Sequence, residues 1–210
     1  MKGTVFSVAL NHRSQLDAWD QALHQPPYQT PPKTPVWFIK PRNTHLANGG
    51  AIPFPAGETV QSGGTLAVII GDTARKVPVE QVSRYLAGYA LANDVSLPES
   101  SFYRPAIKAK CRDGFCPLGE IGQLEAADRL EIVTEINGVE QDRWSTADLV
   151  RSVPELIAAI SDFITLQPGD AVLIGTPHQR VEIKPGDEVT VRAAGLPTLT
   201  NRVTQAGAAS

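Results

Sequence analysis

The stretch that decides the fold is Leu130-Glu-Ile-Val-Thr-Glu-Ile136, followed by Asn137-Gly138 and then by Val139-Glu-Gln-Asp-Arg-Trp144. Apolar and polar residues alternate in the first run, as they do in a half-buried strand. Asn-Gly favours the positive φ angles that both central positions of a tight hairpin turn need. The stretch therefore predicts a β-hairpin over residues 130–144.

Short apolar runs elsewhere predict further strands, and glycine or proline bounds several of them. One of these runs, Leu66–Ile70, is apolar throughout and stops at Gly71, which indicates a strand buried on both faces. The other predicted strands are Thr4–Leu10, Val36–Ile39, Ala171–Ile174 and Glu188–Arg192. Together they predict a predominantly β fold of mixed α+β class.

Helical spacing is found in three places. Residues 16–23 are long enough for a short helix, and Val82, Tyr85, Leu86 and Tyr89 follow the i, i+3, i+4, i+7 pattern of a second. A longer apolar stripe over residues 149–164 predicts a four-turn helix, with Ser145-x-x-Asp148 as its capping box. Pro168-Gly169 ends that helix.

The chain has 210 residues, of which 42% are hydrophobic and 20% charged, so a single domain with a sizeable core is expected. We divide it into an N-terminal α/β segment (residues 1–56), a β-rich domain (57–205) and a frayed tail (206–210). The prolines over residues 26–35 predict a stiff surface loop inside the first segment.

Composition also limits the function. The formal net charge is −3 with no long basic run, which argues against a nucleic-acid or membrane-surface role. Apolar runs fall far short of the roughly 20 residues that span a bilayer, and the N-terminus lacks a signal-peptide layout, so a cytoplasmic location is expected. The two cysteines, Cys111 and Cys116, are too few for a disulfide scaffold and form a poor zinc signature.

Several polar residues are candidates for a site, each beside a plainer interpretation. Asp94 directly follows the predicted helix over 82–89 and either caps a turn or supplies a hard oxygen ligand. Lys108, Lys110 and Arg112 form either a solvated charged segment or a set from which one or two cations point inward. A buried lysine there would hold negative charge that develops during enolisation or decarboxylation.

Other candidates would bind carboxylates. Gly175-Thr176 follows a predicted buried strand, so its N–H groups and hydroxyl either cradle a carboxylate or form a plain turn. Lys40 and Arg42 follow the Val36–Ile39 strand and either neutralise the far carboxylate of a diacid or form surface ion pairs. Arg104 is a further cation for substrate binding.

Three segments in this order and spacing resemble the fumarylacetoacetate hydrolase family: Gly88-Tyr-Ala-Leu-Ala-Asn-Asp-Val-Ser96, Ile107-Lys-Ala-Lys-Cys-Arg-Asp-Gly-Phe-Cys-Pro117, and Ile174-Gly-Thr-Pro177 with a Pro-Gly-Asp before it and another after it. The family cleaves carbon–carbon bonds or moves protons in small 2-keto acids. The resemblance implies a mixed β-roll, with Asp94 as metal ligand, Lys110 as catalytic residue and Thr176 as carboxylate grip.

The sequence departs from the family pattern at the metal site. The family usually places a Glu-x-Glu pair before Leu66-Ala67, where this chain reads Gly63-Gly64-Thr65. The resemblance implies Mg²⁺ or Mn²⁺, but one carboxylate holds Mg²⁺ weakly. Three explanations stay open: the chain works without metal, it recruits metal only together with substrate, or it is a degenerate partner of an active subunit.

Within the family the resemblance is strongest to the N-terminal half of a tandemly duplicated enzyme of 4-hydroxyphenylacetate (homoprotocatechuate) degradation, standing here as a separate subunit. It implies decarboxylation of 5-oxopent-3-ene-1,2,5-tricarboxylate and isomerisation of 2-hydroxyhepta-2,4-dienedioate. Partners would then be the diacid substrate and a second copy or a homologous subunit. The alternatives are a non-catalytic partner of a metal-bearing homologue, a related 2-keto-acid decarboxylase, or an acylpyruvate hydrolase.

Hydrolysis is disfavoured because the family's lid His–Glu pair falls at Gln15 and Ala18 here. Hydrolytic members need a base to activate water. His12 and Asp17 are the remaining candidates for that base.

Overall fold

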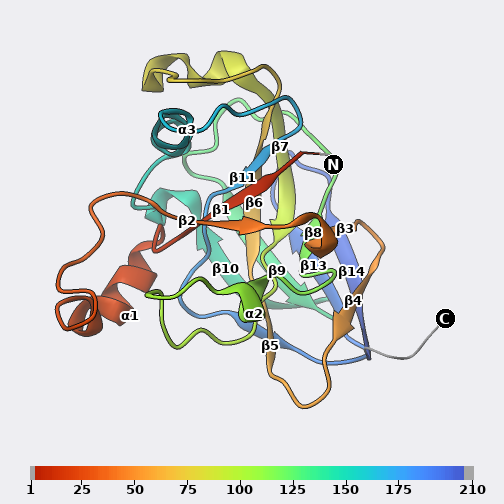
Figure 1. The fold of residues 1–210 in the computed structure, drawn as a ribbon. Helices are drawn as coiled ribbons and strands as arrows, with labels where there is room; N and C mark the ends of the chain where they lie inside the picture. Colours follow the sequence, from red (N-terminus) through yellow and green to blue (C-terminus); the bar gives the residue numbers. More distant parts are fainter. Residues whose placement is uncertain (1–2, 206–210) are drawn as a thin grey trace.

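The computed structural model describes residues 3–205, and these residues form two curled sheets with few helices (Figure 1). The predicted tail, 206–210, lies outside the described residues. The seven-stranded sheet has the order β2 (Val36–Lys40), β1 (Val5–Ala9), β11 (Ala171–Leu173), β6 (Gly64–Ile70), β7 (Leu86–Asn93), β8 (Cys116–Leu118), β3 (His45–Ala47). The five-stranded sheet has the order β10 (Val139–Ser145), β9 (Glu131–Ile136), β13 (Glu188–Arg192), β14 (Leu199–Gln205), β4 (Ala51–Phe54).

A short third pair, β5 (Val60–Ser62) with β12 (Val181–Ile183), lies beside the two larger sheets. The helices are α1 (Arg13–Leu23), α2 (Ile107–Lys110) and α3 (Val153–Ser161), and the 3₁₀ turns are η1 (Arg42–Thr44), η2 (Val79–Tyr85) and η3 (Thr146–Asp148). Within the described residues no helix is both long and apolar enough to cross a membrane.

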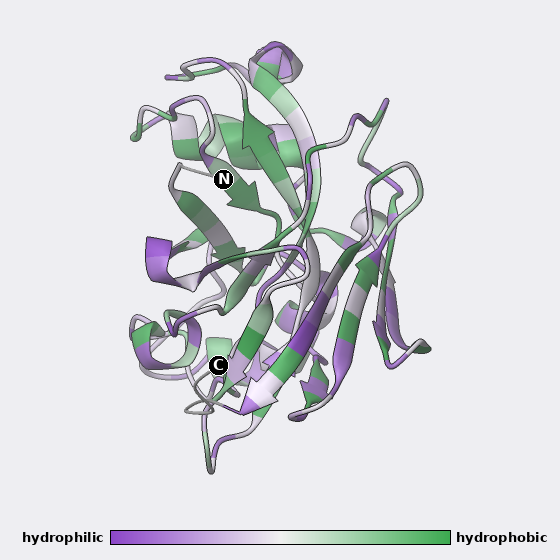
Figure 2. Cartoon of the chain, turned by 90° about the vertical axis from the view of Figure 1, so that its right-hand side faces the viewer, coloured by the Kyte–Doolittle hydropathy of each residue, from purple (hydrophilic) through white to green (hydrophobic). Residues whose placement is uncertain are grey.

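Strand β6 runs through the centre of the core. Leu66, Val68 and Ile70 pack into the main cluster with α3 and the five-stranded sheet, while Ala67 and Ile69 pack into a second cluster on the other face. That second cluster contains several alanines, which let the curled sheet close tightly. Figure 2 shows hydrophobic residues along the interior strands and hydrophilic residues on the loops. The prediction of a strand buried on both faces is confirmed.

The predicted hairpin is confirmed. β9 pairs antiparallel with β10, and Asn137 and Gly138 have φ of 51° and 78°. The strands predicted at residues 4–10, 36–39, 171–174 and 188–192 are present as β1, β2, β11 and β13, and the helix predicted at 16–23 is present as α1.

The helix predicted from Val82, Tyr85, Leu86 and Tyr89 is wrong. Residues 79–85 form η2, and the chain then enters β7, which pairs with β6 along its whole length. Gly88, with φ of 145°, lies in β7 where the backbone of Gly122 approaches closely. Sheet pairing outweighs a helical spacing that is met by only four side chains. Asp94 therefore follows a strand and not a helix.

The long helix predicted over residues 149–164 is shorter than expected. α3 begins after Ser152, whose N–H and hydroxyl both donate to Glu155 Oε2 at 2.7 Å. Pro154 fits the first turn of a helix, where a missing N–H costs little, but not an interior turn. The capping box is therefore 152–155, while Ser145 caps only η3.

Strands from both sides of residue 56 pair with one another. β1 pairs with β11, β3 with β8 and β4 with β14. The N-terminal strands are thus parts of the two large sheets, and α1 is the element of residues 1–56 that projects from them (Figure 1). The division at residue 56 stays a prediction.

Candidate active site

A buried ion cluster forms around Asp94, directly after β7. Lys40 Nζ lies 2.6 Å from Asp94 Oδ1, while Lys110 Nζ and Arg180 Nη2 lie 2.9 and 2.8 Å from Oδ2. The Asp94 side chain is 4% exposed, so these contacts are made almost without water. Lys110 also pairs with Glu99 Oε2 at 3.1 Å. Three cations and two carboxylates leave the cluster with one net positive charge.

Strand pairing explains why these residues meet at Gly63, the residue between β5 and β6. β6 pairs with β7 so that Gly64 lies opposite Asn93, and the next residue, Asp94, donates its N–H to Gly63 O at 2.9 Å. β5 pairs with β12 so that Ser62 lies opposite Val181, which brings the preceding Arg180 towards Gly63. Gly63 thus lies beside both Asp94 and Arg180, which contact each other directly.

Lys40 is a structural cation. It ends β2, is fully buried, and donates to the carbonyls of Val95, Lys110 and Phe115 at 2.8 to 3.0 Å. Because an ammonium has three protons, these carbonyls use all of them. Asp94 Oδ1 therefore has the charge of Lys40 beside it but no hydrogen-bond donor among the described residues. Lys40 was expected either to neutralise the far carboxylate of a diacid or to form a surface ion pair. Its buried contacts with three carbonyls and Asp94 correspond to neither role.

Lys110, the last residue of α2, points inward. This is the second of the two alternatives left open for the charged segment 108–112. Its ammonium lies 4.9 Å from the centre of the Phe38 ring. Burial lowers the pKa of Lys110, and Arg180 lowers it further, against the opposing effect of Asp94 and Glu99. Lys108 is exposed, and Arg112 pairs with Glu58 at 2.9 Å.

The electrostatics keep Asp94 ionised. Burial alone would raise the pKa of Asp94, but Lys110, Lys40 and Arg180 together hold it well below its usual range. A permanent carboxylate at this point holds the two cations Lys110 and Arg180 on one oxygen. Negative charge developing on a ligand close to that oxygen would meet both of them.

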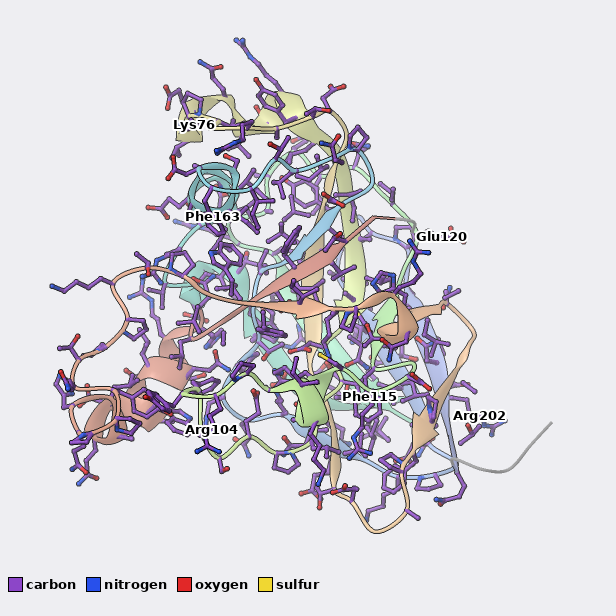
Figure 3. The ribbon with its side chains drawn as sticks, viewed as in Figure 1. Lys76, Arg104, Phe115, Glu120, Phe163 and Arg202 are labelled. Carbon is purple, nitrogen blue, oxygen red and sulfur yellow. The ribbon has the colours of Figure 1, made fainter. Side chains whose placement is uncertain are left out.

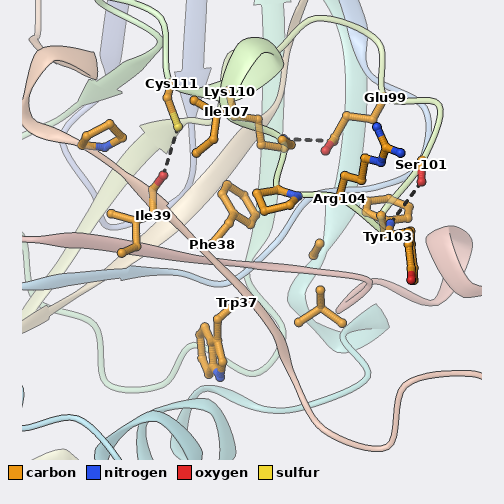
Figure 4. Close-up of a pocket in the computed structure, with 16 residues that line it drawn as sticks. Trp37, Phe38, Ile39, Glu99, Ser101, Tyr103, Arg104, Ile107, Lys110 and Cys111 are labelled. Carbon is orange, nitrogen blue, oxygen red and sulfur yellow. Dashed lines mark hydrogen bonds and ion pairs between the residues drawn. The ribbon is translucent and has the colours of Figure 1, made fainter. Parts of the chain in front are cut away.

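Two cavities lie beside the cluster, and Glu99 and Phe102 line both. The larger, about 640 Å³, is mostly apolar and lies between β2, α2 and the loop 101–106. Figure 4 shows Lys110 reaching towards Glu99 at its wall, with Arg104 nearby. The second, about 530 Å³, is lined by polar side chains of α1 and of the loop after β11, among them Gln15, His178 and Arg180.

The loop after β11 carries Gly175 and Thr176. Gly175 has φ of 104°, and its carbonyl accepts a 2.6 Å hydrogen bond from the Thr65 hydroxyl. Thr176 is buried beside Gly63, and its hydroxyl has no hydrogen-bond partner within residues 3–205. The Arg180 guanidinium also lies beside Gly63, and the unused Thr176 hydroxyl is a donor still available for an anionic ligand in this region.

Of the other candidates, Arg104 is exposed at the apolar cavity, where Figure 3 shows it near the lower end of α1. Arg42 is exposed in η1 and forms no ion pair with a described residue, so the structure does not bring it to the cluster. His12 caps α1 by accepting from Ser14 N, and Asp17 is exposed on the same helix. Burial lowers the pKa of His12.

Gln15 and Ala18 hold the two lid positions. Gln15 is buried and accepts from Leu10 N at 2.8 Å, while Ala18 is exposed. Both cysteines are free thiols, and burial raises the pKa of Cys116 to about 12. None of these side chains supplies a base for water.

The residues present do not fit a tightly held divalent ion. Within residues 3–205 no three His, Cys, Asp or Glu side chains gather as metal ligands. Asp94 is already surrounded by three cations, and Thr65 at one of the two glutamate positions donates to Gly175. A divalent ion would have to displace a guanidinium or an ammonium to reach this carboxylate, against their repulsion.

Comparison with known proteins decides the family. The family model described as "Fumarylacetoacetate (FAA) hydrolase C-terminal" matches residues 4–204. The chain belongs to the fumarylacetoacetate hydrolase family. Its mixed α+β fold of curled sheets with few helices matches the expected fold. The expected roles of Lys110 and Thr176 stay predictions, and the glutamate pair is absent.

Within the family, the chain is similar to proteins of known name. The chain is 64% identical over 203 residues to the 4-hydroxyphenylacetate degradation bifunctional isomerase/decarboxylase of Salmonella dublin, covering 97% of this chain and 47% of that protein. It thus spans about half the length of that relative. Correspondence to the N-terminal half of such a protein stays a prediction.

Solved structures share the fold. A 2-hydroxyhepta-2,4-diene-1,7-dioate isomerase from Mycobacterium marinum is 31% identical, with a TM-score of 0.83 over 98% of this chain and 75% of that one. A maleylpyruvate hydrolase from Sphingobium sp. SYK-6, solved with manganese(II) and pyruvate, is 25% identical, with a TM-score of 0.78 over 97% of this chain and 70% of that one.

Two members of the site could not be found as sequence candidates. Arg180 lies three residues after the Gly175-Thr176-Pro177 motif, in the loop between β11 and β12. Glu99 lies in the loop before α2 and pairs with Lys110. The sequence contains an indirect signal for Arg180. The two glutamates of the family pattern are absent at residues 63 and 65, which leaves Asp94 with less negative charge around it and with space for a cationic side chain.

Proposed function

We propose that this chain acts on an anionic 2-oxo or 2-hydroxy dienoic diacid, as a 5-oxopent-3-ene-1,2,5-tricarboxylate decarboxylase and 2-hydroxyhepta-2,4-dienedioate isomerase subunit. The observation that carries this proposal is Lys110, a buried ammonium held on the Asp94 carboxylate at the wall of the apolar cavity. The names of the similar proteins support the substrate class.

The two reactions need the same stabilisation. In decarboxylation the bond to the departing carboxylate breaks, CO₂ leaves, and the electron pair moves through the double bond onto the 2-oxygen, which is then protonated. In isomerisation the 2-hydroxyl loses its proton, the same dienolate forms, and a proton is added at carbon 5. Both pass through negative charge on the 2-oxygen, which a preorganised buried cation stabilises.

In this proposal the other side chains of the site have the following roles. Lys110 lies next to the 2-oxygen, Thr176 with Gly175 grips the adjacent carboxylate, and Arg104 binds the far carboxylate from the loop that borders the apolar cavity. Asp94 holds Lys110 in position. Glu99 is the second carboxylate of the cluster, and it pairs with Lys110. We assign to Glu99 the role of carrying the proton.

A substitution in α2 tests the proposal with a matched control. Lys110→Met should lower kcat for 2-hydroxyhepta-2,4-dienedioate by about 10² to 10³-fold, the usual effect of removing one preorganised charge donor. Lys108→Met removes an exposed lysine from the same short helix and should leave kcat unchanged. Loss of the diene absorbance reports turnover. Normal kcat in a folded Lys110→Met variant would refute the role of Lys110.

A non-catalytic partner subunit is the second candidate function. The absent glutamate pair and the half-length match to a two-part relative favour it. Under this hypothesis the purified chain alone would have no turnover and would co-purify with a homologue that keeps the Glu-x-Glu pair. A stable, active homo-oligomer would count against it.

A further inference from the structure

The guanidinium of Arg180 lies against the carboxylate of Asp94, the residue to which the family resemblance assigns a metal ion. Arg180 Nη1 donates to Asp94 O and Nη2 donates to Asp94 Oδ2, at 2.6 and 2.8 Å. Its side chain is 8% exposed, yet Arg180 lines the polar cavity. The head group is therefore fixed by the carboxylate and borders space that a ligand can enter.

Gly63 and Arg180 depend on each other. A Cβ atom added at Gly63 would lie 3.0 Å from Arg180 Nη1, from Asp94 O and from the Thr176 Cγ2 methyl. The first of these three neighbours is the guanidinium itself, so a glutamate at residue 63 would push into it. The glycine that removes one family carboxylate thus leaves the space that the arginine fills.

The donors of Arg180 are only partly used. A guanidinium has five N–H groups in a fixed fork, and two of its nitrogens face Asp94. The neighbouring Thr176 hydroxyl has no partner within residues 3–205 and is 2% exposed. The side chains of Arg180 and Thr176 both lie beside Gly63, so they bring a planar cation and an unused hydroxyl donor to one region, which is a pairing suited to a carboxylate.

We propose that Arg180 is a catalytic residue that replaces the divalent ion in this chain. It binds the carboxylate and the 2-oxygen of a 2-oxo acid from the polar cavity, with Thr176 as second donor, and no metal takes part. The proposal rests on the proposed function for its substrate class. Lys110 and Arg180 contact the same Asp94 oxygen, so charge on a 2-oxygen bound beside it meets two fixed cations.

Oxalate is a suitable probe because it presents a carboxylate and an adjacent oxygen and undergoes no turnover. Calorimetry in EDTA should show oxalate binding to the wild-type chain, and Arg180→Gln should weaken it at least tenfold. Arg180→Lys keeps the charge but not the fork and should give an intermediate affinity. Arg202→Gln removes an exposed arginine on β14, far from α1 and α2 in Figure 3, and should bind as the wild type does.

Manganese resonance supplies a measurement that needs no variant. Free Mn²⁺ gives a strong signal that is lost on binding to a protein, and the wild-type chain should leave it intact. With oxalate, which itself chelates Mn²⁺, the signal should equal that of the same oxalate and Mn²⁺ solution without protein, and a loss means a loss relative to that reference. Loss of the signal, or oxalate binding that appears only after Mn²⁺ is added, would overturn the proposal. Unchanged oxalate affinity in a folded Arg180→Gln variant would overturn it as well.

The experiments distinguish failure of the proposed function from failure of the role proposed for Arg180. Metal-free oxalate binding that depends on Arg180, combined with no turnover of the dienedioate, would reject the substrate and keep the role of Arg180. Turnover that EDTA abolishes would keep the substrate and reject the replacement of the metal by Arg180.

Discussion

The chain contains two ion clusters, one buried and one on the surface, and they differ in what they can do. The buried cluster joins Asp94 to Lys40, Lys110 and Arg180, whose side chains are at most 8% exposed. The surface cluster joins Arg143 and Arg192 to Glu131, Glu135 and Glu140 across β9, β10 and β13. Arg143 and Arg192 are 42% and 45% exposed.

The distances in the two clusters are similar, so burial makes the difference. Water and salt screen the exposed pairs, which limits their contribution to stability and leaves their charges satisfied without one another. In the buried cluster each charge depends on its partners, since desolvation without a partner is costly. The second arrangement holds charges in fixed positions, as binding and stabilising an oxyanion require.

Removal of Asp94 should have the largest effect on stability. Asp94→Ala leaves three buried cations without their common partner, and we expect a loss of about 3–5 kcal/mol in the free energy of unfolding at pH 7. Urea denaturation measures it. The pKa of Asp94 is lowered in the folded state, so its contribution is present above the unfolded pKa and disappears as pH falls through the folded pKa.

That contribution should therefore be largely retained at pH 4 and decline only at lower pH. A loss under about 1 kcal/mol at pH 7 would mean that the cluster resembles the surface one. An equal loss at pH 7 and below the folded pKa would contradict the role of ionisation.

Substitution of Lys40 should have the next largest effect on stability. Within the buried cluster Lys40 has a structural role, whereas Lys110 is the residue assigned to the reaction. Lys40→Met leaves three carbonyls without their donor and Asp94 Oδ1 without its nearest cation, which should cost about 2–4 kcal/mol. Lys110→Met should destabilise less, because the Lys110 ammonium pairs with the carboxylates of Asp94 and Glu99 and not with a set of buried backbone carbonyls. Comparing the two denaturant midpoints tests this order, and the reverse order would assign the structural role to Lys110.

Alkaline pH should distinguish Lys110 from an exposed lysine. Burial lowers its pKa below the ordinary 10.5, so the activity that needs the ammonium should fall on an alkaline limb below pH 10.5. Between the folded and unfolded pKa values the unfolded chain binds more protons, so the stability of the wild type should rise with pH relative to Lys110→Met. A limb at or above 10.5 would place Lys110 in contact with bulk water.

The sequence predicts the scaffold of the site better than its charge balance. The hairpin over 130–144 and the buried strand β6 follow from local patterns, since alternation, an apolar run and Asn-Gly each specify a strand or turn directly. The failures at residues 82–89 and 149–152 have tertiary or backbone causes, namely pairing of β7 with β6 and the proline at 154. Asp94 and Lys110 became candidates through the resemblance to the family, and from the residues alone a capped turn and a solvated charged segment stayed open.

Arg180 could not be found in the same way, because its partners are far away in sequence. The pairing of β5 with β12 brings it to Gly63, and no local pattern encodes that register. The contribution of Lys40 depends likewise on three carbonyls from residues 95, 110 and 115. Both cations act through contacts that only the assembled sheets create, whereas the position of a hairpin can be identified within fifteen residues of sequence.

The surface cluster gives the smallest expected effect and completes the comparison. Arg143→Gln removes contacts to Glu131 and Glu140, yet those carboxylates stay hydrated. The denaturant midpoint should shift little at low salt and not measurably at 1 M salt, where the screening length is about 3 Å. Arg180→Gln, measured in the same buffers, should keep its loss of oxalate affinity at both salt concentrations, because its contact with Asp94 is shielded from the solvent. If salt removed both effects equally, burial would not be what separates the two clusters.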